Sequence, residues 1–311
     1  MNFIHQALVF DSAAAFLAAA VPFVTEGVHR GDSVVAVTSD ENEALLREQI
    51  GADAERIIFL ATSAWYDSPG RTLDAYHRRI DALPGTTGIL RVLGQPIWTG
   101  RDTLETSEWG RYESVMNVAL AESRAWIMCG YDSRSLPTAI VDDARRTHPT
   151  LAVGPQSEVS ITYADPAFYY AEHNGPLAAR PAHGVEQLVD FIDMAPVRQF
   201  VADHAVRLGV PADRLDDFTL AVNEIATNAI RHGAGRGEVR LWATDQRVIC
   251  EIADTGGAPK KNGRNGFLGF LRSDPQAGQG HGLWIARQIC DLLEMRTGAD
   301  GTTVRLHMRR E

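Results

Sequence analysis

Two polar side chains lie one helical turn apart in the C-terminal half of the chain. Apolar residues recur at helical spacing over residues 213–232, and Glu224 and Asn228 share one stripe beside that apolar face. A carboxylate there can act as a general base, and the amide oxygen can bind a metal ion next to it. The alternative is a solvated polar edge, which this spacing alone does not exclude.

A second group of candidate residues follows an apolar strand over residues 248–254. The strand closes with Asp254, and Gly256 follows at once, so that the backbone of a ligand-bearing loop can pass close by. The Asp254 carboxylate can accept a hydrogen bond from an exocyclic amine such as that of adenine. Thr302, at the start of the last predicted strand, could hold a water molecule against the same base. An ordinary DTGG turn is the alternative.

Alternating glycines precede an apolar helix at residues 278–283 (GQGHGL). The exposed N–H groups and the dipole at a helix N-terminus suit phosphate oxygens. The long loop before these glycines does not fit the Rossmann dinucleotide pattern.

The first half of the chain carries scattered groups that could meet at the ends of strands, where open α/β sheets bind ligands. We expect a sensory pocket there, lined by His5, Glu113, Cys129, Tyr131 and His148. Structural roles compete with this expectation, because Cys129 suits an apolar core and His148 suits the end of a helix. A metal or haem site is the least favoured interpretation of these residues.

The elements that must position these residues differ between the two halves. In the first half, short apolar strands alternate with helices, which predicts a parallel α/β sheet covered on both faces. The predicted strands are residues 3–10, 33–38, 56–60, 88–93 and 125–131, and the predicted helices are residues 13–24, 40–50, 72–83, 106–123 and 135–147. The turn after the first strand has no glycines, and the only two lysines are Lys260 and Lys261, so a Walker-type NTPase is excluded in this half.

The second half groups helices before strands, which predicts an α+β sandwich with helices on one face of a mixed sheet. Residues 177–184, rich in Gly, Pro and Ala, form the expected linker. The predicted helices are residues 194–208, 213–232 and 283–293, and the predicted strands are residues 237–244 and 247–254 with two more within residues 295–309.

Composition excludes several classes of function. The 311 residues are 45% hydrophobic and 23% charged, as in a globular protein, and the net charge of -10 argues against nucleic-acid or anionic-membrane binding. Three scattered cysteines fit a reducing cytoplasm rather than a disulfide framework. The apolar residues 13–24 are too few to span a bilayer, so we expect a cytoplasmic protein.

The pieces of the second half, in their order, resemble the GHKL (Bergerat) ATP-binding fold of gyrase and histidine kinases, over residues 185–311. The resemblance implies that Glu224 is the general base, that Asn228 binds Mg²⁺ and that Asp254 binds the adenine amine. It makes residues 257–278 the ATP lid. The other residues that it implies at the ATP site are His232, Gly256, Gly278, Gly280, His281, Gly282, Leu283 and Thr302.

Within that superfamily, the sequence LAVNEIATNAIRHG at residues 220–233 is most similar to actinobacterial anti-sigma serine/threonine kinases of the SpoIIAB/RsbW type. This resemblance implies ATP- and Mg²⁺-dependent phosphorylation of a STAS-type anti-anti-sigma factor, binding of a sigma factor, and a homodimer. Gln279 and His281 depart from the family, which often has an arginine in this motif. The alternatives are a non-catalytic ATP-binding switch and an orphan histidine kinase-like protein with His204 as phosphoacceptor.

Residues 1–176 resemble the MEDS domain, a sensory module of DcmR-type regulators that is similar to a RecA-like domain without a P-loop. The resemblance rests on short pieces spread over this half, among them Pro22, Phe23, Arg91, Gly94, Trp98, Cys129, Tyr131, Asp132, His148 and Pro149. It implies the sensing of an unidentified small-molecule or protein signal.

Overall fold

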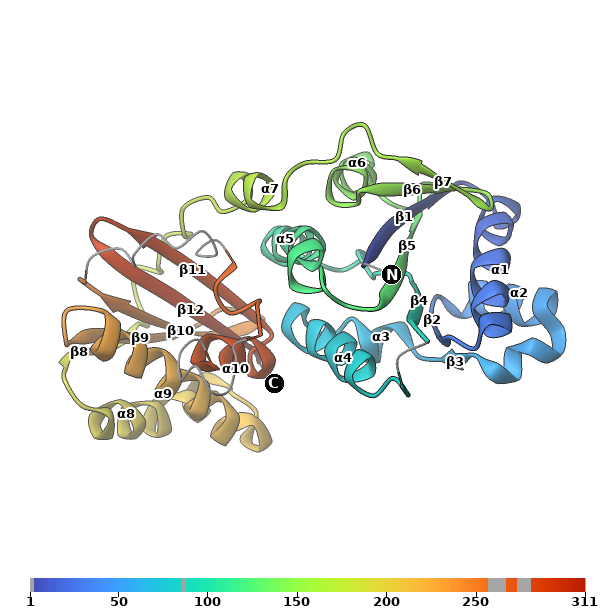
Figure 1. The fold of residues 1–311 in the computed structure, drawn as a ribbon. Helices are drawn as coiled ribbons and strands as arrows, with labels where there is room; N and C mark the ends of the chain where they lie inside the picture. The colour runs from blue at the N-terminus through green and yellow to red at the C-terminus, as the bar shows by residue number, and fades with distance from the viewer. Residues whose placement is uncertain (1–2, 86–87, 257–266, 273–280, 311) are drawn as a thin grey trace. The chain divides into compact units, whose positions relative to one another are not determined.

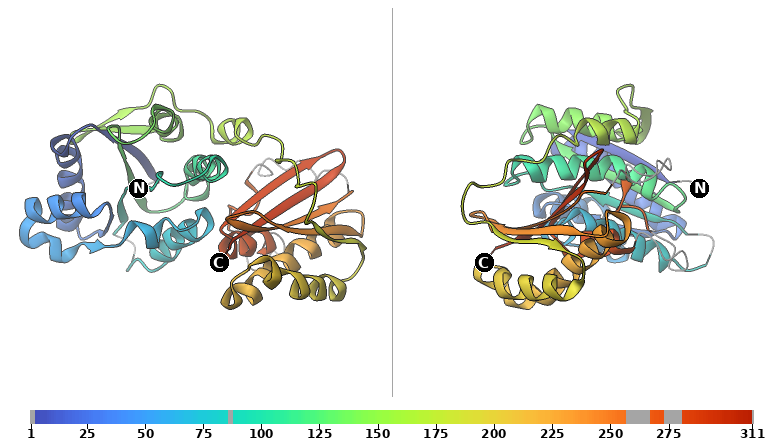
Figure 2. Two further views of the ribbon diagram at one scale, coloured as in Figure 1. Left: turned by 180° about the vertical axis from the view of Figure 1, so that it is seen from behind. Right: turned by 90° about the vertical axis from the view of Figure 1, so that its left-hand side faces the viewer.

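The computed structural model describes residues 3–85, 88–256, 267–272 and 281–310. The chain separates into two compact units, the first comprising Met1–Asp67 with Thr72–His173 and the second Ser68–Arg71 with Asn174–Glu311 (Figures 1 and 2). Among the helices of the described ranges, none has the length and apolar character needed to cross a membrane.

The first unit is built on a seven-stranded sheet in the order β3-β2-β4-β5-β1-β6-β7. All strand pairs are parallel except β6 with β7, which confirms the predicted α/β class and adds one antiparallel edge strand. The strands are β1 (Ile4–Phe10), β2 (Ser33–Val37), β3 (Ile58–Phe59), β4 (Leu90–Gly94), β5 (Ala125–Asp132), β6 (Thr150–Val153) and β7 (Gln156–Val159).

Helices connect these strands and cover the sheet. They are α1 (Ala13–Arg30), α2 (Asp40–Ile50), α3 (Thr62–Trp65), α4 (Pro69–Asp81), α5 (Thr103–Ala119), α6 (Thr138–Thr147) and α7 (Pro166–Glu172), with a 3₁₀ turn at Gly51–Arg56. The hydroxyl of Ser12 caps α1 by accepting from the N–H of Ala15, and Gly31 ends it with φ at 75°. The apolar side of α1, with Phe16, Phe23 and Val24, packs on one face of the sheet.

The side chain of Arg91 lies wholly inside the first unit. Arg91, on β4, is 0% exposed, and its Nε donates to Oδ2 of Asp32 over 2.8 Å. Its Nη1 reaches the carbonyl of Phe23 and Oε2 of Glu26, each at 3.2 Å. Asp32 also accepts from the N–H of Ile89, so this carboxylate ties the turn after α1 to the start of β4. A buried charge is tolerated only when it is paired in this way.

The second unit is a five-stranded antiparallel sheet in the order β11-β12-β10-β9-β8 (Figure 1). Its strands are β8 (Glu186–Phe191), β9 (Gly237–Ala243), β10 (Arg247–Asp254), β11 (Leu292–Gly298) and β12 (Gly301–Arg309). The helices α8 (Met194–Leu208), α9 (Leu215–His232) and α10 (His281–Ile289) pack their apolar sides on one face of the sheet, and a 3₁₀ turn, Ala212–Arg214, precedes α9. The α+β class is confirmed, although we predicted a mixed sheet.

Two local predictions in the second unit are wrong for identifiable reasons. The predicted helix over residues 283–293 ends at Ile289, because Leu292 and Leu293 pair with His307 and Leu306 in the sheet. Strand β8 lies on an edge of the sheet and is largely exposed, so it lacks the apolar run by which we recognised the other strands.

The Arg91 network yields a stability prediction. Asp32→Ala leaves the buried Arg91 guanidinium with only Glu26 and one carbonyl, and we expect it to lower the free energy of unfolding by about 3–5 kcal/mol. Glu43→Ala removes a partly exposed partner of Arg47 and should cost about 0.5 kcal/mol or less. Denaturant unfolding of the full chain, followed by tryptophan fluorescence, compares the two, and equal costs would contradict the assigned role of Asp32.

Candidate functional site

In the second unit, the side chains of Glu224 and Asn228 on α9 lie beside the first turn of α10. Glu224 and Asn228 are half-buried on α9, one turn apart, next to its apolar side. Gly282 lies directly against them: a Cβ at this position would stand 2.7 Å from Oε2 of Glu224 and 3.3 Å from Nδ2 of Asn228. The structure thus brings the carboxylate, the amide and a helix N-terminus to one place, which is an arrangement suited to phosphate and a cation.

A second group of candidate residues gathers at the end of β10. The carboxylate of Asp254 accepts from the N–H of Gly256 over 2.9 Å, and Asp254 stands opposite Thr302 in the sheet. A Cβ at Gly233, directly after α9, would lie 2.7 Å from Cγ of Asp254. Burial raises the pKa of Asp254, and hydrogen bonds from the backbones of Gly256 and Thr302 oppose that rise. Glycines therefore leave room around a carboxylate that is partly withdrawn from water.

The remaining ATP-site candidates divide into three groups. His232 ends α9 and His281 begins α10, and both side chains are exposed. Leu283 packs against the core of the second unit. Gly278, Gly280 and the two lysines, Lys260 and Lys261, lie outside the described residues.

Part of the predicted ATP lid is packed into the second unit. Of the predicted residues 257–278, the structure describes residues 267–272, and within them Phe267 and Phe270 are buried. The guanidinium carbon of Arg287, on α10, lies 3.6 Å from the centre of the Phe270 ring. The glycine-rich sequence predicts only a loop here, although two phenylalanines within it are a usable signal for a buried anchor.

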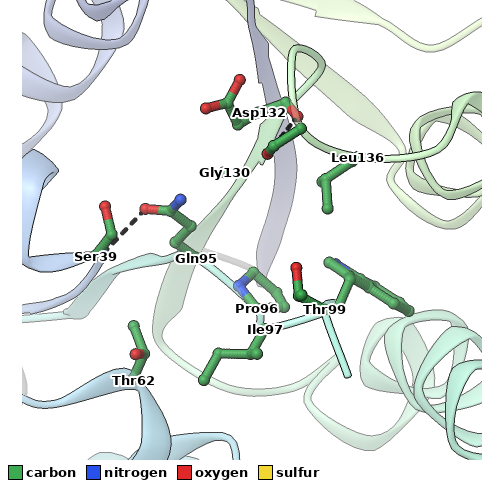
Figure 3. A pocket seen from close by; sticks show the side chains of 11 residues that line it. Ser39, Thr62, Gln95, Pro96, Ile97, Thr99, Gly130, Asp132 and Leu136 are labelled. Atoms are coloured by element: carbon green, nitrogen blue, oxygen red, sulfur yellow. Dashed lines mark hydrogen bonds between the residues drawn. The ribbon is translucent and has the colours of Figure 1, made fainter. Parts of the chain in front are cut away.

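A cavity of about 170 Å³ opens at the carboxyl ends of β2, β4 and β5 in the first unit (Figure 3). In its wall, Oε1 of Gln95 accepts from the N–H of Ser39 and from Nδ2 of Asn42. This volume fits a molecule of few heavy atoms, since drug-sized pockets exceed about 300 Å³. The cavity is lined by Ser39, Thr62, Gln95, Pro96, Ile97, Trp98, Thr99, Gly130, Asp132, Ser135 and Leu136. None of the five residues that we expected in a sensory pocket is in this wall.

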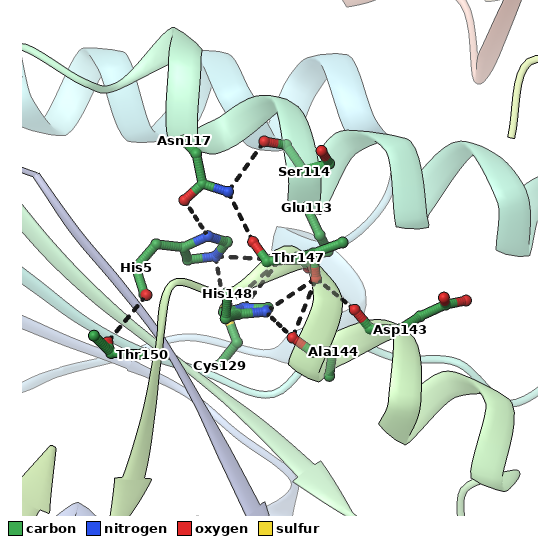
Figure 4. Close-up of polar contacts among 10 residues, drawn as sticks. All are labelled: His5, Glu113, Ser114, Asn117, Cys129, Asp143, Ala144, Thr147, His148 and Thr150. Carbon is green, nitrogen blue, oxygen red and sulfur yellow. Dashed lines mark hydrogen bonds and ion pairs between the residues drawn. The ribbon is translucent and has the colours of Figure 1, made fainter. Parts of the chain in front are cut away.

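Four of those five residues, all except Tyr131, instead meet inside the first unit, where α5 and the end of α6 face β1 and β5 (Figure 4). His5, Glu113, Cys129 and His148 are each 2% exposed or less, and their ligating atoms all lie within 4.8 Å of one another. The Tyr131 ring stands 5.7 Å from the ring of His148. The sequence singled out each residue, and the fold shows that four of them form one buried cluster.

Burial shifts the protonation of this cluster. It lowers the pKa of His5 and of His148 to about 3, raises the pKa of Glu113 to about 7, and raises the pKa of the Cys129 thiol. Both imidazoles are therefore neutral at physiological pH, because a low-dielectric interior disfavours the charged form.

Comparisons with known proteins agree with this two-unit architecture. Residues 4–149 match the MEDS family, described as the methanogen/methylotroph, DcmR sensory domain. Residues 189–308 match a histidine kinase-like ATPase domain family. No curated protein sequence matches the chain.

Among solved structures, the chain is similar to the RsbU and RsbW domains of Rv1364c from Mycobacterium tuberculosis. The identity is 19% and the TM-score is 0.30, over 40% of this chain and 32% of that one. The chain therefore spans about a third of that relative. The two family matches and the two sheets together show that the chain joins an N-terminal MEDS sensory domain to a C-terminal histidine kinase-like ATPase domain.

Proposed function

We propose that this chain is a sensor-controlled partner-switching regulator whose second unit is an ATP- and Mg²⁺-dependent serine/threonine kinase. Its substrate is a STAS-type anti-anti-sigma factor, and the same unit holds a sigma factor when that antagonist is phosphorylated. The observation that carries the proposal is the packing of Gly282 against Glu224 and Asn228, which brings a carboxylate and an amide beside a helix N-terminus.

Phosphoryl transfer needs positioning, charge neutralisation and a residue that orients the nucleophile. In this proposal the N–H groups of the first turn of α10 bind phosphate oxygens, and the amide oxygen of Asn228 holds Mg²⁺ against them. Asp254 accepts from the adenine amine, and the oxygen of Glu224 accepts the proton of the attacking serine hydroxyl. His232, Gly256, His281, Leu283 and Thr302 complete the proposed ATP site, together with Gly278 and Gly280.

The first unit supplies the signal in this proposal. Its small, polar-walled cavity at the strand ends is the natural place for a compact ligand, since open α/β sheets bind ligands at this edge. Cytoplasmic location and a homodimer, as in kinases of this type, belong to the same proposal.

Glu224→Gln tests the chemical step, because it keeps the size of the side chain and removes the base. We expect transfer of phosphate from ATP to the STAS protein to slow at least about 100-fold, which is the usual contribution of a general base. ATP affinity should stay within about 2-fold, because Glu224 acts on the hydroxyl rather than on the nucleotide. Asp217→Asn, in the first turn of the same helix, is the matched control and should transfer normally.

Two other results would replace this proposal. No transfer by either wild type or Glu224→Gln despite ATP binding would favour the non-catalytic switch, whereas equal transfer by both would show that Glu224 is not the general base. Acid-labile phosphate on His204 of this chain, in place of acid-stable phosphoserine on the partner, would favour the histidine kinase-like alternative.

Gly282→Ala tests the assembly of the site. Its Cβ would stand 2.7 Å from Oε2 of Glu224 and 3.3 Å from Nδ2 of Asn228, so both side chains must shift, and displacing the Asn228 amide should cost about 1–3 kcal/mol in ATP binding. Gly298→Ala is the control, since a Cβ there meets nothing within 4 Å. Calorimetric titration with ATP should show about 5- to 150-fold weaker binding for Gly282→Ala only. Unchanged affinity would place the nucleotide elsewhere.

A further inference from the structure

The buried cluster in the first unit brings four metal-ligating side chains to one point from four parts of the chain. His5 comes from β1, Glu113 from α5, Cys129 from β5, and His148 directly follows α6. Nε2 of His5 lies 3.4 Å from Oε2 of Glu113 and 3.7 Å from Sγ of Cys129. Oε2 of Glu113 lies 3.6 Å from Nε2 of His148 and 3.9 Å from Sγ of Cys129.

The hydrogen bonds around the cluster fix which nitrogen of His5 carries the proton (Figure 4). The amide nitrogen of Asn117 donates to the carbonyls of Ser114 and Thr147, at 3.1 Å and 2.7 Å. Oδ1 of Asn117 therefore faces Nδ1 of His5, 3.2 Å away, and can only accept. His5 must hold its proton on Nδ1, which leaves a lone pair on Nε2 directed into the cluster.

His148 is fixed in the same tautomer by an independent contact. Its Nδ1 lies 2.8 Å from the carbonyl oxygen of Ala144, which has no proton to give. The lone pair of His148 is thus also on Nε2, the atom that faces Glu113. Metal-binding histidines are oriented in this way, with the nitrogen that does not bind the ion donating to a carbonyl or amide oxygen.

The cluster has more acceptors than protons. Within the part of the chain that the structure describes, neither Oε1 of Glu113 nor Nε2 of His148 has a hydrogen-bond partner, although both atoms are fully buried. A buried polar atom left in this state costs about 1–3 kcal/mol. The cluster thus directs two imidazole lone pairs, a carboxylate and a sulfur toward one another. A single bound cation would satisfy all four of these electron-pair donors.

We propose that His5, Glu113, Cys129 and His148 form a binding site for one divalent transition-metal ion, of which Zn²⁺ is the best fit. Thiolate and carboxylate together carry two negative charges, so a divalent ion makes the buried site neutral. Zinc bonds of about 2.0–2.3 Å to nitrogen, oxygen and sulfur give ligand-to-ligand distances of about 3.3–3.6 Å in a tetrahedron. The four separations given above, 3.4–3.9 Å, lie within a few tenths of an ångström of these values, and the ligand atoms of all four residues lie within 4.8 Å of one another.

The mixed nitrogen, sulfur and oxygen donors also select the ion. Ca²⁺ and Mg²⁺ require oxygen ligands, whereas imidazole and thiolate favour zinc and its neighbours in the first transition row. Binding must release the proton of Cys129 and any proton held by Glu113, because the ion takes their place.

The test uses the full chain, loaded with Zn²⁺ and dialysed, with metal content measured by mass spectrometry. We expect one Zn²⁺ per wild-type chain. Cys129→Ser and His148→Gln should each weaken the affinity for Zn²⁺ at least about 100-fold, and Asn117→Leu about 10- to 100-fold through loss of the orientation of His5. Cys290→Ser, which changes a buried cysteine of the second unit, should keep one Zn²⁺.

Cobalt substitution keeps the proposal testable if a variant fails to fold. A chain loaded with Co²⁺ in place of Zn²⁺ should show the near-ultraviolet band of a cobalt–thiolate bond and the visible bands of a tetrahedral site. Wild type and Cys290→Ser should both show them. A wild-type chain without bound metal, a cobalt spectrum without the thiolate band, or full metal content in Cys129→Ser would overturn the proposal.

Discussion

The positions of the Glu224 and Asn228 side chains beside α10 depend on the absence of a side chain at position 282. A single added carbon would stand 2.7 Å from Oε2 of Glu224 and 3.3 Å from Nδ2 of Asn228, so it would displace both groups. Helices α9 and α10 bury their apolar sides on one face of the sheet, and that packing holds the contact in place. The apolar packing of α9 and α10 on the sheet thus holds the side chains of Glu224 and Asn228 beside the first turn of α10.

The first unit contains two sets of buried ionisable side chains that differ in how completely their hydrogen bonds are satisfied. Around Arg91, the carboxylate of Asp32, a second carboxylate and a carbonyl satisfy the guanidinium. In the cluster of His5, Glu113, Cys129 and His148, the outer hydrogen bonds are complete and the inner atoms are not. The side chains are thus oriented from outside, while Oε1 of Glu113 and Nε2 of His148 keep free acceptor capacity inside the cluster.

The sequence predicts the elements well where burial leaves a periodic pattern. The stripe of Glu224 and Asn228 follows from the helical period of α9, and the α/β and α+β classes follow from the order of apolar runs. The edge strands β7 and β8 escape prediction because exposed strands need no apolar run. The buried Phe270 escapes it because the surrounding glycines indicate only a loop.

The candidate residues of the first unit show a different limit. Each of these residues has a side chain that can bind a ligand or a metal ion. No spacing or motif in the sequence, however, predicts that position 5 contacts positions 113, 129 and 148. The parallel register, with Ala7 opposite Cys129, and the packing of α5 and α6 over the sheet bring them together. Residue types therefore identify the candidate members of the cluster, but only the topology of the fold shows that they contact one another.

Aromatic rings link the small cavity to the buried cluster. Trp98 forms part of the cavity wall, and its ring centre lies 6.2 Å from that of Tyr131, which in turn stands 5.7 Å from His148. These rings are large, rigid and almost wholly enclosed. Trp98 and Tyr131 thus form a continuous aromatic contact between the wall of the cavity and the side chain of His148.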